Sequence, residues 1–61
     1  MPARLYDAAF AQTHIDEVEA VTSARADRLA AIKNYLRFGE AFGLPDAALN
    51  VWRDYVEGGV A

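Results

Sequence analysis

Apolar residues recur with the period of an α-helix through the centre of the chain. Between residues 29 and 42 they cover about half of the helical circumference, while Lys33, Arg37 and Glu40 lie on the other half. An apolar stripe this wide has to pack against more than one neighbouring element. The stripe contains Leu29, Ala31, Ile32, Tyr35, Leu36, Phe38, Gly39 and Phe42.

The sequence FGLP at residues 42–45 predicts that this helix ends in a tight corner. A glycine after the last helical residue adopts the left-handed conformation at little cost, and an apolar residue after it folds back onto the last turn. Pro45 cannot continue the first helix but can open the next one. Gly39, one turn earlier, would let another backbone or the Trp52 ring approach closely, or it is simply a helix glycine tolerated at a cost of about 1 kcal/mol. We expect the corner to consist of Gly39, Phe42, Gly43, Leu44, Pro45 and Trp52.

A shorter helix is predicted after the corner, over residues 46–57. Leu49, Trp52 and Val56 form one apolar stripe on it. Two glycines, at residues 58 and 59, end the helix.

A long helix is predicted before the corner, over residues 13–42. Thr13 and Asp16 have the spacing of a capping box, in which each side chain bonds the other residue's backbone N–H. Acidic residues then precede basic ones, the order that the helix dipole favours. Residues 1–12 are expected to form a helical N-terminal arm, with Pro2 suited to a first helical position.

Two other divisions of this region remain open. An unbroken helix could begin at Ala3, because Tyr6 and Phe10 extend the same face. Thr22-Ser23 is a second place where the helix could break, although nothing in its sequence requires a break.

These patterns predict an all-α fold in a single domain of 61 residues, with a long helix folded back on a shorter C-terminal helix. A chain this short buries only about 60% of the surface that its unfolded form exposes. It has no Cys and one His, so disulfides and multi-His metal clusters cannot support it within one chain. Oligomerisation is the support that remains, and we expect a homodimer or a higher oligomer built on the long helices.

Charged residues interrupt the apolar face upstream of Leu29. Helical spacing places Glu17, Arg25 and Arg28 on the side of Val18 and Val21, where an unpaired charge is costly. A helix break could rotate these residues outward, or the arginine stems could cover apolar surface. An antiparallel copy of the helix, crossing near Val21, would instead set Glu17 opposite Arg25.

The chain has three Phe, three Tyr and one Trp, more aromatic residues than three short helices can enclose. We expect Phe38, Phe42 and Trp52 in the core, and Tyr6, Phe10 and Tyr35 at a contact surface, where Tyr is a common anchor. The candidate interaction residues are Tyr6, Phe10, Glu17, Val18, Val21, Arg25, Arg28 and Tyr35.

The charge balance narrows the class of partner. A net charge of −3 and a pI near 4.8 disfavour binding to nucleic acid, whose phosphates require a basic surface. No apolar run approaches the roughly 20 residues of a membrane span, and the N-terminus lacks the apolar segment of a secretory signal. We therefore expect a cytoplasmic protein.

No pattern in the sequence indicates catalysis or a cofactor. His14 and Glu17 have the spacing of a metal-binding pair on a helix, but the other acidic residues lie elsewhere on the helix surface. The chain has no phosphate-binding loop, nucleophile elbow or zinc motif. We expect no catalytic residue, no metal and no cofactor.

Residues 39–55 resemble a helix-turn-helix, with Gly43 at the turn and inward residues at Leu49 and Trp52. That resemblance implies a DNA-binding regulator, although the second helix offers mainly acidic and small side chains to DNA. The sequence favours a small helical protein that self-associates and docks on a larger protein as an accessory, regulatory or inhibitory module.

Overall fold

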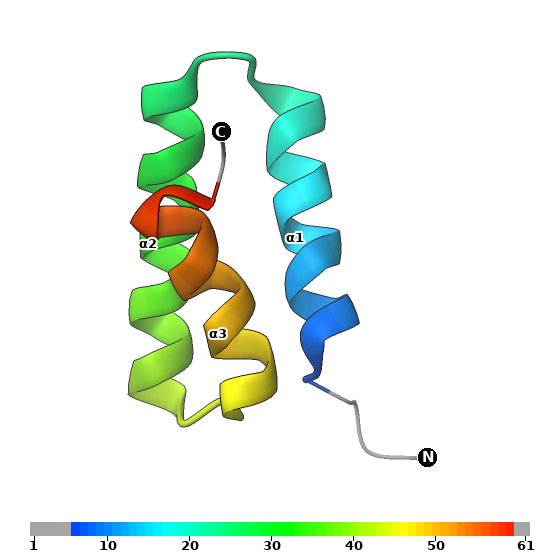
Figure 1. The fold of residues 1–61 in the computed structure, drawn as a ribbon, viewed down its shortest axis with the longest axis vertical. Helices are drawn as coiled ribbons and strands as arrows, with labels where there is room; N and C mark the ends of the chain where they lie inside the picture. Colours follow the sequence, from blue (N-terminus) through cyan, green and yellow to red (C-terminus); the bar gives the residue numbers. More distant parts are fainter. Residues whose placement is uncertain (1–5, 60–61) are drawn as a thin grey trace.

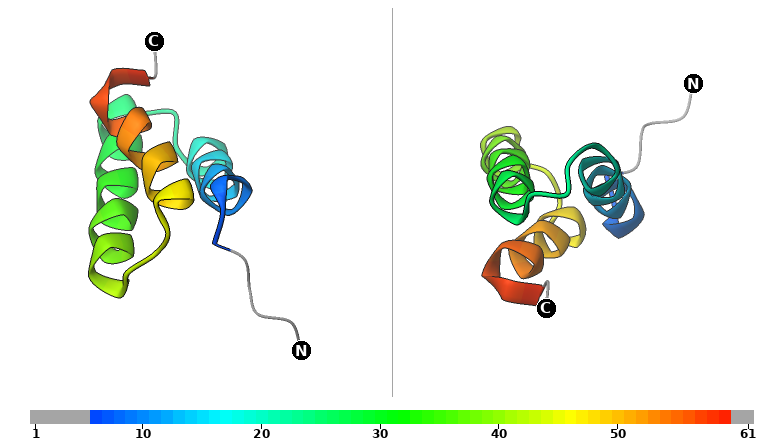
Figure 2. Two further views of the ribbon diagram at one scale, coloured as in Figure 1. Left: turned by 60° about the horizontal axis from the view of Figure 1, so that its bottom comes forward. Right: turned by 90° about the horizontal axis from the view of Figure 1, so that it is seen from above.

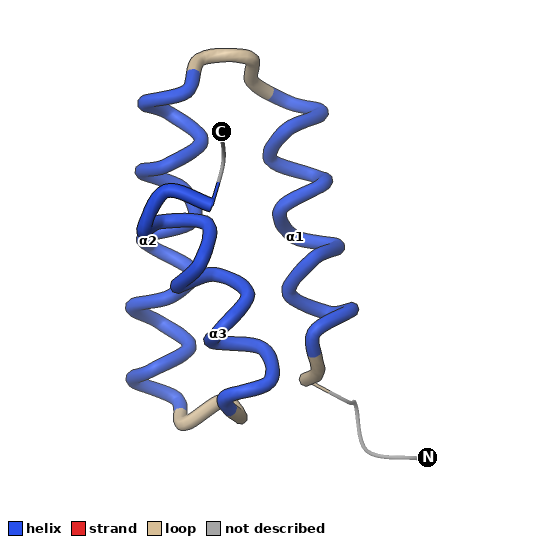
Figure 3. Tube along the Cα trace, viewed as in Figure 1, coloured by secondary structure: helices blue, strands red, loops and turns tan. Residues whose placement is uncertain are grey.

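The computed structural model describes residues 6–59, which form three α-helices (Figure 1). These are α1 (Ala8–Val21), α2 (Arg25–Phe42) and α3 (Asp46–Asp54), followed by a last, wider turn over Tyr55–Gly59. Figure 3 shows loops only at the ends of the helices, and the described residues include no strand. The all-α fold class is confirmed.

The first two helices form an antiparallel hairpin, and α3 lies along one side of it (Figure 2). α3 packs more extensively against α1 than against α2. The described residues therefore cover one side of the hairpin and leave its other side uncovered.

The first helix begins earlier than the sequence predicts and runs without a break through Thr13. Its cap is Asp7, whose side chain accepts a hydrogen bond of 3.0 Å from the N–H of Phe10. The Thr13 hydroxyl donates instead to the Ala9 carbonyl oxygen one turn earlier, at 2.9 Å. The predicted capping box and the arm boundary after residue 12 are therefore wrong. The remainder of the predicted arm, residues 1–5 with Pro2, lies outside the described part of the chain.

The long helix predicted over residues 13–42 is divided into two helices at residues 22–24. Thr22 and Ala24 have extended backbone conformations, with ψ of 137° and 117°. The Arg28 Nη1 group donates to the Ser23 carbonyl oxygen at 2.6 Å and faces the Thr22 carbonyl oxygen at 3.5 Å. The break is stable because these loop carbonyls, which the helices leave without a partner, receive a side-chain donor.

The corner between α2 and α3 is a Schellman motif. Gly43 has φ of 75° and donates its N–H to the Glu40 carbonyl oxygen at 3.3 Å. The N–H of Leu44 donates to the Gly39 carbonyl oxygen at 2.9 Å. Leu44 thereby folds back onto the last turn of α2, and its side chain packs against the core.

Gly39 allows α3 to approach α2 closely at this corner. A Cβ at Gly39 would lie 2.8 Å from Leu49 Cδ2 and 3.0 Å from Trp52 Cζ3. Both distances are shorter than a carbon–carbon van der Waals contact. A side chain at this position would force the two helices apart.

The core lies where all three helices meet around Trp52, which is 2% exposed. The indole N–H of Trp52 donates to the Ala11 carbonyl oxygen in α1 at 3.1 Å. Trp52 thus contacts α1 through a hydrogen bond, and its ring packs closely against α2 at Gly39. The buried apolar residues are Ala11, Ile15, Val18, Ile32, Ala48, Leu49, Trp52 and Tyr55.

Candidate interaction surface

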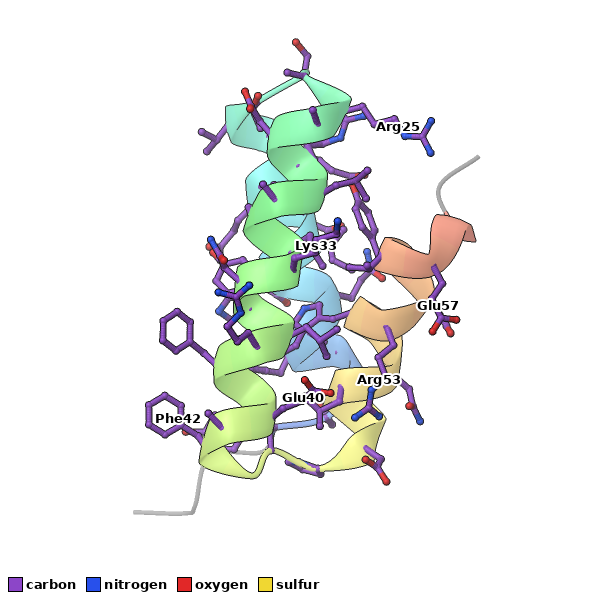
Figure 4. The ribbon with its side chains drawn as sticks, turned by 90° about the vertical axis from the view of Figure 1, so that its left-hand side faces the viewer. Arg25, Lys33, Glu40, Phe42, Arg53 and Glu57 are labelled. Carbon is purple, nitrogen blue, oxygen red and sulfur yellow. The ribbon has the colours of Figure 1, made fainter. Side chains whose placement is uncertain are left out.

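We name the side of the α1–α2 hairpin opposite α3 the open face. Large apolar side chains that are exposed in residues 6–59 are Tyr6 at 38%, Val21 at 86%, Phe38 at 58% and Phe42 at 80%. Phe42 projects away from α3 in Figure 4. Helical spacing places Phe38 and Phe42 on the same stripe of α2 as Ala31 and Tyr35. The open face consists of Glu17, Val18, Val21, Thr22, Ala31, Tyr35, Phe38 and Phe42.

Phe38 and Phe42 form an exposed aromatic pair at one end of this face. Their ring centroids are 6.4 Å apart and their planes differ by only 18°. The sequence prediction that both rings lie in the core is wrong. The break at residues 22–24 turns α1 back beside α2, and α3 occupies the side of Ile32 and Gly39, so nothing in residues 6–59 covers the pair.

The other end of the open face contains a depression of about 260 Å³ between α1 and α2. Val18, Val21 and Ala31 supply apolar walls. Glu17 and Tyr35 add a carboxylate and a phenol ring to the lining. The lining residues are Glu17, Val18, Val21, Thr22, Ala31 and Tyr35.

Tyr35, which lines the depression, packs against other aromatic rings. Tyr35 stacks on Trp52 with ring centroids 5.8 Å apart and planes 25° apart. His14 meets Tyr35 edge-on at 5.1 Å and lies 4.5 Å from Phe10. The His14 Nδ1–H donates to the Phe10 carbonyl oxygen at 2.9 Å, since a carbonyl can only accept. These contacts fix the position of Tyr35 before any partner binds.

The structure brings four of the eight predicted interaction residues together: Glu17, Val18, Val21 and Tyr35 line the depression. Tyr6 and Phe10 form a separate edge-to-face pair at the start of α1, with centroids 4.9 Å apart. Arg28 is half-buried against the loop at residues 22–24. Arg25 extends toward the α3 side of α2 in Figure 4.

Within residues 6–59, Glu17 and Arg25 form no ion pair with each other or with any other residue. The break at residues 22–24 instead divides this segment into α1 and α2, which run antiparallel within one chain. Pairing of Glu17 with Arg25 across a second copy of the helix stays a prediction. Sequence reasoning missed Phe38, Phe42, Ala31 and Thr22 as residues of the open face. The Thr22-Ser23 break was the one pattern that could have revealed them, because it decides which side of α2 faces α1.

The outer surface of α3 offers little to DNA. Arg53 is the one basic residue of this helix, and its guanidinium bonds Glu40 at 3.1 Å, Asn50 at 3.1 Å and Asp46 at 3.5 Å. The hydrogen bond with Glu40 is the largest of the effects that raise the pKa of Arg53 above its ordinary value. A recognition helix needs cations and amides directed at phosphates and base edges. In α3 the guanidinium of Arg53 is instead paired with Glu40 and Asp46 of its own chain, so it is not directed at DNA.

Comparisons with protein-family models, curated proteins and solved structures found no match. Within residues 6–59, no helix is both long and apolar enough to cross a bilayer. The same residues contain no group of three or more His, Asp or Glu side chains placed to hold a metal ion.

Proposed function

We propose that this chain is a small helical interaction module that docks its open face on a larger protein, as an accessory, regulatory or inhibitory protein. The observation that carries the proposal is the exposure of Val21, Phe38 and Phe42 on one side of the hairpin, at 86%, 58% and 80%. Single exposed apolar residues are ordinary on a soluble protein, but grouped ones mark interaction sites. Exposed aromatic rings are especially frequent at the centre of protein interfaces.

The size of the face suits a specific protein partner. The molecule measures 37 × 20 × 18 Å, so its largest side is comparable to the roughly 800 Å² that each partner contributes to a standard interface. Burying one Phe side chain contributes about 1.5–3 kcal/mol relative to leaving it in water. The Phe38–Phe42 pair is therefore the expected energetic centre of the interface.

Self-association is part of the same proposal. Two copies that meet through the open face would cover each other's Phe38 and Phe42 in a symmetric contact. The larger partner would then displace the second copy, because both bind the same apolar surface. DNA binding through α3 remains the alternative from sequence, and no contact of Arg53 favours it.

Site-specific photo-cross-linking tests the proposal. A benzophenone amino acid is placed at position 42 or 21 on the open face, and at Ala47 on exposed α3 or Ala26 on exposed α2 as matched controls. We expect discrete adducts with another protein from positions 42 and 21 and much weaker adducts from 47 and 26. Phe38→Ser should reduce the adduct at position 42. Equal cross-linking from all four positions, or adducts from position 47 alone, would overturn the proposal.

A further inference from the structure

We propose that the depression lined by Glu17 and Tyr35 binds an arginine or lysine side chain of the docked protein. The proposal deepens the function proposed above and rests on it. It assigns a ligand chemistry to the end of the open face that lacks the Phe38–Phe42 pair.

The dimensions of the depression suit one side chain. Its volume of about 260 Å³ is below the range of roughly 300–1,000 Å³ typical of pockets for drug-sized ligands and cofactors. Val18, Val21 and Ala31 form apolar walls for a chain of methylene groups. Lys and Arg bury such stems along apolar surface while the charged head reaches a polar group.

The negative charge of α1 favours a ligand whose charged head is a cation. Residues Ala8–Val21 include three carboxylates, at Asp16, Glu17 and Glu19, and no Lys or Arg. Glu17 is the carboxylate among them that lines the depression, and within residues 6–59 it has no ion-pair partner. A guanidinium or ammonium group placed there would form a charge-assisted hydrogen bond that the isolated chain lacks.

Arg28 and Arg25, the chain's own basic residues near this site, are directed elsewhere. The Arg28 guanidinium is bound to the loop carbonyls of Ser23 and Thr22. Arg25 extends to the α3 side of α2, away from the open face (Figure 4). The cation is therefore expected from another molecule.

Tyr35 adds a second favourable interaction. Tyr35 stacks on Trp52 and is one of the residues that line the depression. A cation within about 6 Å of an aromatic ring is attracted by the ring's negative face. Tyr35 and Glu17 come from α2 and α1, so a bound guanidinium would link the two arms of the hairpin.

A fragment titration tests this site without knowledge of the partner. The probe is n-butylguanidinium, which has the stem and charge of an arginine side chain, and 1-butanol is the neutral control. Backbone amide shifts of the full chain are followed by NMR at a protein concentration where light scattering gives a constant mass. We expect saturable shifts at Val18, Val21, Thr22 and Ala31 with n-butylguanidinium and much weaker ones with 1-butanol.

Variants of two glutamates separate a specific site from a general charge effect. Glu17→Gln should weaken n-butylguanidinium binding about fivefold, the effect of losing one partly exposed charged contact. Glu19→Gln removes the same charge from an exposed position of the same helix and should leave the binding unchanged. Both positions are exposed, so circular dichroism should report an unchanged fold.

Three outcomes would overturn the assignment. They are the absence of saturable shifts at the depression, equal binding of 1-butanol, and equal loss of binding in Glu17→Gln and Glu19→Gln. Fragment binding without cross-linking specific to the open face would instead overturn the proposed function and leave a cation site. The two proposals can therefore fail separately.

Discussion

The indole N–H of Trp52 donates a hydrogen bond to the backbone carbonyl oxygen of Ala11, 41 positions earlier in the chain, at 3.1 Å. This is the longest-range side-chain hydrogen bond within residues 6–59. It joins α3 to α1, two helices with no direct connection in sequence. It therefore helps to hold α3 on one side of the hairpin.

Trp52→Phe should lower the free energy of unfolding by about 2 kcal/mol. About 1 kcal/mol comes from the lost hydrogen bond, and the rest from the smaller ring in a buried site. Urea denaturation followed by circular dichroism measures the change, since the variant lacks the fluorescent indole. An unchanged unfolding midpoint would show that the Trp52–Ala11 bond does not stabilise the fold.

Gly39→Ala should destabilise the protein even though Ala is the better helix former. The helix propensity of Ala favours the variant by about 1 kcal/mol. The new Cβ would meet Leu49 Cδ2 at 2.8 Å and Trp52 Cζ3 at 3.0 Å, and overpacking of this kind costs about 1–3 kcal/mol. Because the Trp52 ring is held by its bond to Ala11 and cannot easily shift, we expect a net loss of about 1 kcal/mol.

Thermal unfolding of Gly39→Ala and Ala41→Gly provides the comparison for this prediction. Ala41 is exposed on the same helix, so its change to Gly reports helix propensity alone. A stabilised Gly39→Ala protein would mean that α2 and α3 separate there at no cost.

The local chemistry of the α2–α3 corner is visible in the sequence, whereas the division of the long helix is not. Gly43 permits the left-handed conformation because it has no Cβ, and Pro45 fixes its own φ and cannot continue the helix, so four adjacent residues suffice to predict the turn. The break at residues 22–24 contains neither Gly nor Pro, and it depends on Arg28 reaching back to the loop carbonyls. Such a contact by a side chain five or six residues later has no signature in the residue pattern.

The unpredicted break also explains the error at Phe38 and Phe42. A single long helix would have placed their stripe against a neighbour, and periodicity alone cannot tell a core stripe from an unpaired one. Trp52 was assigned correctly to the core because it lies on the inner side of the predicted corner. The depression required two helices to be placed side by side, so no pattern in one segment could define it.

Arg28→Met should weaken the connection between α1 and α2. Met keeps the apolar stem but removes the donor to the carbonyl oxygens of Ser23 and Thr22. A hydrogen bond from a charged group contributes about 1.5–3 kcal/mol, so we expect a loss of about 1.5 kcal/mol in the free energy of unfolding. Hydrogen exchange should also accelerate at the amides of the last turn of α1.

Arg25→Met is the matched control for this prediction. Arg25 is exposed and forms no side-chain hydrogen bond within residues 6–59, so its loss should change stability by less than about 0.5 kcal/mol. Equal effects of the two variants would show that charge, and not the loop contact, stabilises the hairpin.

Replacing the exposed aromatic pair should reduce association without unfolding the chain. Phe38 and Phe42 are 58% and 80% exposed, so the double change to Ser removes little buried surface and should shift the free energy of unfolding by less than about 1 kcal/mol. The same rings would be buried where two copies meet through the open face, and each contributes about 1.5–3 kcal/mol there. We therefore expect the concentration at which the chain self-associates to rise at least tenfold, as measured by light scattering across a hundredfold range. Ala47→Ser on exposed α3 should leave that concentration unchanged. If the double variant associates as strongly as the native chain, the open face is not the surface through which copies meet.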